Sequence, residues 1–462
     1  MDKLNIGFNN KKIVISIAII VVMYFLGGIY FYSHYAFNTY INGINVSCKS
    51  TDNAARKIID SFDNYELQLN EKNGMQETIY GQDINLNCSC SRDKLQEIQK
   101  KQKSYLWIIS LPKKENYEIS DLVYYDKDKL SNIISNLKCI SGNDIIEPSN
   151  PYFEYIDGKY NVTSEVYGNK VNTDLFNEAV KKAIDSGKKN IDLDSENCYE
   201  KPKYTLKSDK VLKTKEILDK YVSSKIIYDF DEETETVDGD TINKWLKIND
   251  DLDVEFDKEN VKEYIEGLCK KYNTVGQERE FKTSSGKNIT IKGGYYGWKI
   301  NSDEEINSLI ENIEKGQNIM KEPIYSQKAV SRKKDDIGDT YVEVNITRQH
   351  LWFYKNGKLV TQGDVVTGNI NKGCATSLGV YPLNYKQKNA TLKGFGYSSP
   401  VKYWMPFNGN IGIHDASWRS SFGGDIYKSN GTHGCVNAPQ YLAKAIYEEI
   451  DSGIPIICYE EK

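Results

Sequence analysis

One cysteine of the sequence lies in a setting suited to nucleophilic chemistry, within the stretch GTHGCVN at 431–437. Cys435 follows His433 by two positions, although the 462 residues contain only four histidines. A thiol attacks as its thiolate, and a neighbouring imidazolium lowers the pKa of a cysteine from about 8.5 by several units. A cysteine acyl enzyme also needs N–H groups that face the oxyanion, and the consecutive amides of Gly434 and Cys435 can supply them. The stretch therefore offers a candidate cysteine nucleophile, and a chance pairing of one cysteine with one histidine is the alternative.

A second histidine is a better candidate for the general base than His433. His433 is close to the cysteine in sequence, and the glycine between them leaves the relative direction of the two side chains open. His414, in IGIHDASWR at 411–419, ends a predicted short strand and can reach across to the thiol. A catalytic base must be oriented through its other ring nitrogen. The candidates for that role are the carbonyl or carboxylate of Asp415 and the hydroxyl of Thr432.

Short runs of alternating, β-branched or aromatic residues surround these candidates, and this texture is typical of strands. The sequence KNGK within the second run predicts a tight hairpin turn. We therefore expect a mostly β domain of about 120 residues with one clear helix and a final strand. The runs are YVEVNI (341–346), HLWFYKNGKLV (350–360) and GDVVTG (363–368), the helix is YLAKAIYEEI (441–450), and the strand is PIICYE.

The spacing from the histidine to the cysteine resembles the signature of the L,D-transpeptidase (YkuD-type) family. His414 is followed by seventeen residues and then by THGCVN. The family signature is a histidine, a gap of about this length, and Ser/Thr-His-Gly-Cys-apolar-Asn/Arg. The resemblance covers about 340–460 and has one departure, because Ser377 in TSLGVY stands where the family usually has proline. That position shapes a loop and carries no chemistry.

The resemblance implies a role for each residue of the site. Cys435 is the nucleophile and His414 the general base, held through Asp415. His433 and Gly434 frame the oxyanion hole together with the Cys435 amide. The residues that shape the loop are Thr432 and Asn437, and those expected to line the cleft are Trp404, Met405 and Trp418. For these three aromatic or apolar residues, ordinary core packing is an equal alternative.

The reaction that the resemblance implies is a two-step acyl transfer on peptidoglycan stem peptides. Cys435 attacks the carbonyl of the third residue of a tetrapeptide stem, D-alanine leaves, and the amine of a neighbouring stem takes the acyl group to give a 3→3 cross-link. No metal or organic cofactor is needed, and carbapenems are expected to acylate the cysteine. The alternatives are L,D-carboxypeptidase activity or D-amino-acid exchange through the same acyl enzyme, or a wall-binding structural protein with an inactive domain.

The N-terminal region predicts a membrane helix. Residues 13–32 contain no charge, and a helix of this length spans about 30 Å, the thickness of the bilayer hydrocarbon core. Lys3, Lys11 and Lys12 precede it, so we expect residues 1–12 in the cytoplasm, an anchor at 13–33 and the bulk of the chain outside, facing the cell wall. A cleaved signal peptide is the alternative.

A motif recurs three times ahead of the predicted β domain, as IYGQDIN (79–85), VYGNKVN (166–172) and YYGWKIN (295–301). Strand-like residues precede each copy, and residues at helical spacing follow it, with Asn, Ser or Thr placed to cap a helix. We therefore expect repeated α+β modules that resemble peptidoglycan-binding modules, with a stalk as the alternative. The expected divisions are 38–115 (a weak repeat), 116–203 and 204–325, then a linker at 326–339 and the catalytic domain at 340–462.

Charge and cysteine usage exclude other classes of function. The net charge is −5 without a basic block, so nothing indicates nucleic acid. The nine cysteines form no CxxC pair, and His433 and Cys435 have no second pair nearby, so the spacing of a structural zinc site is missing. An odd number of cysteines leaves at least one thiol free if the others pair.

Overall fold

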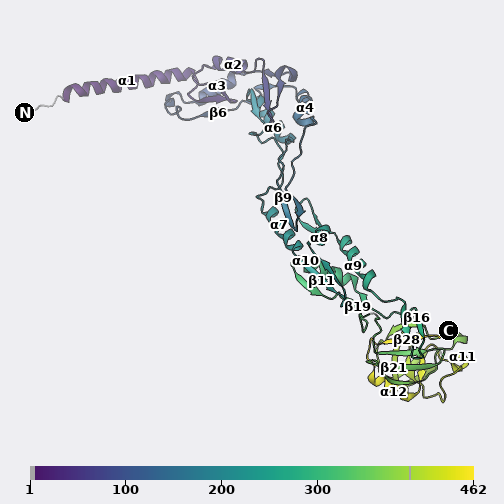
Figure 1. Ribbon diagram of the computed structural model, residues 1–462. Helices are drawn as coiled ribbons and strands as arrows, with labels where there is room; N and C mark the ends of the chain where they lie inside the picture. Colours follow the sequence, from purple (N-terminus) through teal and green to yellow (C-terminus); the bar gives the residue numbers. More distant parts are fainter. Residues whose placement is uncertain (1–5, 334, 395–396, 462) are drawn as a thin grey trace, which may run out of the picture. The chain divides into compact units, whose positions relative to one another are not determined.

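Helix α1 (Ile6–Ser33) is the first element of the chain (Figure 1). Its part from Lys11 to Ser33 is long and apolar enough to cross a membrane, by length and composition. The large apolar side chains along this part are mostly exposed, as a lipid-facing helix requires. The helix begins earlier than the expected 13–33 span, and Tyr35, two residues after its end, is already fully buried.

The computed structural model describes residues 6–333, 335–394 and 397–461, which divide into two compact units. The first unit comprises the described residues up to 152 together with 162–211, and the second comprises 153–161 and the residues from 212 onward. After α1, the elements of the first unit are β1 (Thr39–Ile41), β2 (Ile44–Asn45), α2 (Thr51–Asp60), β3 (Glu66–Asn70), β4 (Gln76–Tyr80), the 3-10 turn η1 (Gly81–Ile84), β5 (Asn87–Cys88), α3 (Arg92–Lys101), η2 (Ser104–Leu106), β6 (Glu115–Tyr117), β7 (Val123–Tyr124), α4 (Lys127–Asn136), α5 (Lys138–Ser141), α6 (Thr173–Asp185) and β10 (Asn190–Asp192).

The modules expected at 38–115 and 116–203 are not separate domains, which corrects the division drawn from the sequence. Strand β10 pairs in parallel with β3, and β3 pairs antiparallel with β4, so one sheet joins the two segments. One buried apolar cluster extends from Tyr35 to Tyr199. The physical reason is size, because strands as few and short as these cannot bury their helices alone.

The recurring motif caps helices in its second and third copies, as expected. The Asn172 side chain accepts the N–H of Leu175 at the start of α6. Asn301 does the same for Glu304 at the start of α10 (Ser302–Glu314). In the first copy the equivalent Asn85 follows η1 in a left-handed conformation (φ 52°) and caps no helix. The first copy is therefore a divergent repeat.

The second unit begins with an α+β module. Its three-stranded sheet has the order β12-β11-β18, and helices α9 and α10 contribute to one apolar core with it. The elements of this module are β8 (Tyr152–Ile156), β9 (Lys159–Thr163), α7 (Asp209–Val222), β11 (Lys225–Asp229), β12 (Thr234–Val237), α8 (Gly239–Ile242), η3 (Asn243–Trp245), β13 (Leu246–Ile248), β14 (Val254–Phe256), α9 (Lys258–Tyr272), β15 (Arg279–Lys282), β16 (Asn288–Ile291), β17 (Lys299–Ile300), α10, β18 (Asn318–Lys321) and β19 (Tyr325–Gln327).

The C-terminal part of the second unit is mainly β, as predicted. A five-stranded sheet has the order β22-β21-β20-β28-β23, and a four-stranded sheet has the order β24-β25-β26-β27. Side chains from both sheets and from α12 meet in one core. The elements are β20 (Tyr341–Asn345), β21 (His350–Lys355), β22 (Lys358–Asp364), η4 (Ile370–Lys372), β23 (Gly379–Pro382), β24 (Gln387–Gly394), β25 (Tyr397–Asn408), β26 (Ile411–Asp415), α11 (Ile426–Asn430), β27 (Val436–Ala438), α12 (Gln440–Glu449) and β28 (Pro455–Tyr459).

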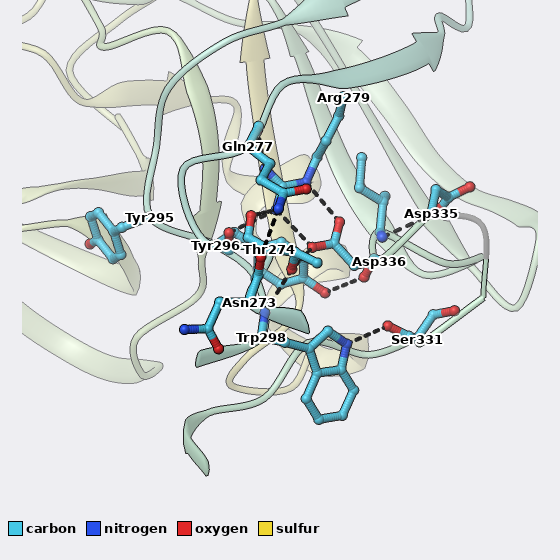
Figure 2. Close-up of polar contacts among 12 residues, drawn as sticks. Asn273, Thr274, Gln277, Arg279, Tyr295, Tyr296, Trp298, Ser331, Asp335 and Asp336 are labelled. Carbon is cyan, nitrogen blue, oxygen red and sulfur yellow. Dashed lines mark hydrogen bonds and ion pairs between the residues drawn. The ribbon is translucent and has the colours of Figure 1, made fainter. Parts of the chain in front are cut away.

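The expected linker at 326–339 is packed rather than free. Figure 2 shows the Arg279 guanidinium facing the Asp336 carboxylate, and both side chains are buried. Arg279 donates Nε to Asp336 Oδ1 and Nη2 to Oδ2, each over 2.7 Å, and its other N–H groups reach main-chain carbonyls. The charged segment expected as a linker is therefore fixed by a bidentate ion pair, which is stronger than a single charged contact.

The hairpin of β15 and β16 contacts the C-terminal β part directly. The buried carboxylate of Glu343 in β20 accepts the N–H of Ser284 over 2.9 Å and its hydroxyl over 2.5 Å. Phe281 and Ile291 of the hairpin share an apolar cluster with residues of β23 and β28. The hairpin thus joins the module to the β part through both polar and apolar contacts.

Candidate active site

Two parallel strands bring the sequence-predicted nucleophile and base to one face. In β26 and β27, Ile413 is opposite Val436 and His414 is opposite Asn437. Successive side chains of a strand point to opposite faces, so His414 and Asn437 share a face. Cys435 immediately precedes β27 and continues this alternation, which places it level with Gly412 and on the face of His414.

His414 is a buried imidazole oriented by the main chain. Its Nδ1 lies 3.0 Å from the carbonyl oxygen of Asp415, and its exposed fraction is 4%. A carbonyl oxygen can only accept, so Nδ1 carries the proton and Nε2 keeps its lone pair. Burial lowers the pKa of His414 below its ordinary value, and the adjacent Asp415 opposes this effect only in part. The ring is therefore neutral at neutral pH, as a base must be.

The Asp415 carboxylate has a different role from the carbonyl of the same residue. Its Oδ1 accepts the main-chain N–H groups of Lys402 and Tyr403, each over 2.8 Å. These bonds hold β25 against β26, beside the histidine. Of the candidates for orienting His414, the geometry selects the carbonyl of Asp415. The carboxylate supports the strand instead.

Hydroxyl groups hold the loop that carries Cys435. The Thr432 hydroxyl donates to the Cys435 carbonyl over 2.6 Å and accepts the Gly434 N–H over 3.0 Å. Gly434 adopts φ +117°, a conformation that favours glycine. Thr376 donates its hydroxyl to the Gly434 carbonyl over 2.7 Å. The Gly434 amide is thus used within the loop, which corrects its expected service as an oxyanion donor and leaves the Cys435 amide as the candidate.

The buried setting of the Cys435 thiol disfavours the thiolate expected from the neighbouring histidine. Burial raises its pKa above the ordinary value, and a contact with the Gly412 main chain lowers it only in part. The Sγ atom lies 3.5 Å from the Asn410 carbonyl oxygen, which suits a weak S–H donor. His433 is exposed, whereas Cys435 is partly buried. The side chain of His433 thus lies closer to solvent than that of Cys435.

Two tryptophans flank the base, and the methionine expected beside them does not. The rings of Trp404 and Trp418 have their centroids 5.8 Å and 5.9 Å from that of His414. Trp404 is buried, whereas Trp418 is 51% exposed and is in contact with solvent. Met405 is fully buried in the core of the β part, which agrees with the alternative of core packing. The reason is alternation, because neighbours in β25 face opposite sides.

Sequence reasoning missed several polar groups near the site. Arg419 is half-buried, its charge acts on His414, and burial lowers its pKa. Within the described part of the chain, Arg419 Nε and Asn437 Oδ1 are buried polar atoms without a hydrogen-bond partner. Arg419 ends the stretch IGIHDASWR, so its proximity to the histidine was a usable signal. No sequence pattern pointed to Thr376, because its hydrogen-bond partner Gly434 is distant in the chain.

Metal-binding geometry occurs away from this site. Among the described residues, the one group of Cys, His, Asp or Glu side chains close enough to share an ion is Glu71, Glu77 and Cys139, in the first unit. All nine cysteines are free thiols in this structure. Cys435 and His414 together thus offer a nucleophile with a base, and they do not form part of a ligand set.

Comparison with protein families gives two matches. A profile described as "L,D-transpeptidase catalytic domain" matches residues 339–458. A profile described as "Putative peptidoglycan binding domain" matches residues 99–192 and 204–320. No protein in the curated set matches the chain.

Solved structures with similar sequences come from several bacteria. A Cys-to-Ser mutant of the Enterococcus faecium L,D-transpeptidase is 34% identical over 54% of this chain and 100% of its own, with a TM-score of 0.44. The catalytic domain of the E. faecium enzyme, acylated by ertapenem, is 40% identical over 26% of this chain and 98% of its own, with a TM-score of 0.25. An L,D-transpeptidase from Stackebrandtia nassauensis is 28% identical over 26% of this chain and 55% of its own, with a TM-score of 0.23.

Proposed function

This chain belongs to the L,D-transpeptidase family, and on that premise we propose that it forms 3→3 cross-links in peptidoglycan through a thioester on Cys435. The observation that carries the proposal is the register of β26 and β27, which puts an oriented, neutral His414 on the same face as the thiol. Family membership rests on the matched profiles and on sequence identity over the full length of a relative.

The first step forms the acyl enzyme. The Cys435 sulfur attacks the carbonyl carbon of the third residue of a tetrapeptide stem, and the thiol proton passes to Nε2 of His414. The tetrahedral intermediate collapses, the peptide bond to the terminal D-alanine breaks, and His414 returns its proton to the leaving amine. A thioester and free D-alanine result. A positioned base of this kind contributes about a hundredfold to ten-thousandfold in rate.

The second step transfers the acyl group. The side-chain amine of a third residue on a neighbouring stem attacks the thioester carbonyl, and His414 accepts a proton from that amine. The carbon–sulfur bond breaks, the thiolate recovers a proton, and an amide joins the two stems. Water at the same position would give a hydrolysed stem instead, so exclusion of water decides between the two products.

The resting state of the pair suits proton transfer during attack. Both groups are held neutral because burial disfavours their charged forms. A neutral thiol next to a neutral imidazole needs no preformed ion pair, and charge develops only as the bond to carbon forms. We place the Cys435 amide at the developing oxyanion, with Thr432 and Thr376 fixing the loop that aims it.

The modules and helix α1 support a reaction at the cell wall. The modules that match the peptidoglycan-binding profile would hold polymer near the site, since remote binding raises apparent affinity before it changes the chemical step. Helix α1 would anchor the chain in the cell membrane with its bulk outside. Cleavage of this helix as a signal peptide is the alternative, and N-terminal sequencing of protein recovered from membranes separates the two.

Product analysis tests the proposed reaction. Purified full chain is incubated with disaccharide-tetrapeptides, and the muropeptides are identified by mass spectrometry with fragmentation. We expect dimers linked between third residues, together with one free D-alanine per dimer. Tripeptide alone would show hydrolysis as the activity, and unchanged tetrapeptide in both wild type and Cys435→Ala would contradict the proposal.

A further inference from the structure

A loop of the first unit carries large apolar side chains on its surface. This loop, residues 103–114 (KSYLWIISLPKK), follows α3 and includes η2. Single exposed apolar residues are ordinary on soluble proteins, but a continuous patch marks an interaction surface. Ile109 is the most exposed of the set at 63%, and the others are Tyr105, Leu106, Ile108 and Leu111.

The 103–114 loop packs against the apolar helix α1. The Tyr24 hydroxyl donates to the Tyr105 carbonyl over 2.6 Å, and Trp107 Nε1 donates to the Tyr24 carbonyl over 3.1 Å. A Cβ atom at Gly27 would lie only 2.5 Å from the Trp107 ring, so the glycine permits this contact. The Phe31 ring stacks on the same indole, with centroids 5.7 Å apart.

These contacts place the 103–114 loop alongside the apolar part of α1, below its end. Tyr24 precedes Ser33, the last residue of the candidate membrane span, by nine residues. At 1.5 Å per residue this separation is about 13.5 Å along the helix. If α1 spans the bilayer, a loop bonded to Tyr24 lies within the outer half of the hydrocarbon layer, which is about 15 Å deep.

Several main-chain groups of the loop are bonded within it, which lowers the cost of an environment without water, where each unpaired N–H or C=O costs several kcal/mol. Successive turns are closed by bonds from the Leu106 amide to the Lys103 carbonyl, over 2.8 Å, and from the Ile109 amide to the Leu106 carbonyl, over 2.9 Å. The Ser110 hydroxyl donates to the Trp107 carbonyl over 2.6 Å. These bonds satisfy part of the polar groups of the loop, beside its exposed apolar side chains.

Lysines flank the apolar patch on both sides. Exposed Lys101 and Lys103 precede it, and exposed Lys113 and Lys114 follow it. Long lysine side chains keep their ammonium groups in water or among headgroups while their stems cover apolar surface. Each basic residue near an anionic membrane surface contributes about 1 kcal/mol of attraction. Charge and apolar surface therefore point to one partner, a bilayer that contains anionic lipid.

We propose that the 103–114 loop inserts into the outer leaflet beside α1 and fixes the first unit on the membrane. The proposal rests on the membrane anchoring proposed above and is independent of the chemistry at Cys435. Its occupant is lipid, because the patch is continuous with the apolar surface of α1 and carries lysines at both ends. Helix α1 and the 103–114 loop then hold the first unit on the membrane at two places, so that the unit does not move freely about the end of α1.

Quenching of tryptophan fluorescence by brominated lipid tests the insertion. The full chain is reconstituted in vesicles of phosphatidylcholine and phosphatidylglycerol, with bromine on the acyl chains of the phosphatidylcholine. Trp107 is one of six tryptophans, and the other five lie in the second unit. We expect bromine to quench roughly one sixth of the emission in wild type and none of it in Trp107→Phe. Equal quenching in the two proteins would overturn the proposal.

A paired substitution separates lipid contact from packing against α1 alone. Ile108→Asp with Ile109→Asp places two carboxylates in the exposed patch, so the bromine quenching of Trp107 should fall by at least half and quenching by aqueous acrylamide should rise. Ile146→Asp, at another exposed apolar residue of the same unit, serves as the matched control and should change neither. Flotation with vesicles confirms that α1 is inserted in every variant.

Two outcomes would overturn the proposal while leaving the reaction at Cys435 untouched. If the Asp pair leaves the quenching of Trp107 by bromine unchanged, the loop does not face lipid. If Trp107 is shielded from both quenchers and the Asp pair converts a dimer into a monomer in sedimentation, the patch is covered by a second copy of the chain. Cross-linking activity on soluble muropeptides should stay at wild-type level in the Asp pair variant.

Discussion

The imidazole of His414 donates its Nδ1 proton to the main-chain carbonyl oxygen of Asp415 across 3.0 Å. The neighbouring carboxylate points elsewhere and accepts two amides of β25. A backbone carbonyl fixes the ring orientation and tautomer as well as a carboxylate does, but it adds no full negative charge to stabilise an imidazolium. Asp415 therefore orients the base through its main-chain carbonyl, and its carboxylate has a different, structural role.

We predict that Asp415→Asn keeps most of the acylation activity. The asparagine Oδ1 can accept the same two amides, and the carbonyl that orients His414 is part of the main chain. The rate of acylation by a carbapenem, followed by intact mass, should stay within about tenfold of wild type, far less than the loss of a general base. Asp415→Ala is the matched variant and should unfold at lower temperature, because two partly buried amides lose their acceptor. A loss in Asp415→Asn as large as that in His414→Ala would show that the carboxylate takes part in the chemistry.

The two histidines of the site should differ sharply. His414→Ala should slow acylation by about a hundredfold or more, the usual scale for a general base. His433→Gln should retain a larger part of the activity, because this side chain is exposed and its neighbour Gly434 is held by Thr432. The same intact-mass measurement compares both variants with wild type. Equal losses in the two would leave His414 without a distinct role.

The pH dependence of acylation follows from the pKa directions at the site. Burial lowers the pKa of His414 below 6.5, so the ring stays unprotonated and active until the pH falls below that value. Burial raises the pKa of Cys435 above 9.0, so the thiol persists through neutral pH and ionises only in strong alkali. The rate should therefore fall on the acid side below pH 6.5 and show no rise with thiol ionisation near neutrality.

Ultraviolet absorbance of the thiolate checks this resting state directly. The difference spectrum of wild type against Cys435→Ser should show no thiolate at pH 7, since the other cysteines are common to both proteins. A thiolate signal that is present at pH 7 and lost on the acid side in step with activity would instead indicate a preformed ion pair with an imidazolium.

The buried ion pair between Arg279 and Asp336 should be essential for the stability of the second unit. Asp336→Ala leaves a buried guanidinium without its partner, and breaking such a pair costs about 3–5 kcal/mol. Thermal unfolding should shift to lower temperature, and the segment 326–339 should become sensitive to protease. Lys328→Ala in the same segment removes an exposed ion pair with Glu322 and a cation–π contact with Tyr325, and is the matched control. Identical unfolding of the two variants would show that the pair does not stabilise the joint.

Local patterns predicted the parts of the fold that depend on nearby residues. The alternating runs after 340 and the helix near 441–450 correspond to the observed sheets and to α12, because strand and helix periods are visible within a few residues. Asn172 and Asn301 cap helices for the same reason. Strand alternation also decides between the two alternatives kept for Met405, because its neighbour Trp404 faces His414 and adjacent strand residues face opposite sides.

Long-range relations were beyond the sequence patterns. Pairing of β3 with β10 joins residues far apart in the chain, so the boundary expected near 115 fell within one core. Asp336 was expected in a charged linker, because its partner Arg279 is distant in the sequence. The raised pKa of Cys435 depends on burial by several strands, whereas the motif alone suggested a thiolate.

The central claim is that Cys435 alone carries the acyl group, with His414 as its base. The most direct measurement is peptide-mapped mass spectrometry of the full chain after brief incubation with a tetrapeptide stem and acid quenching. We predict an adduct with the mass of the stem less D-alanine, on the peptide that contains Cys435 and on none of the peptides with the other eight cysteines, strongly reduced in His414→Ala. An adduct on another residue, or cross-linking that persists at wild-type rate in Cys435→Ala, would contradict the account.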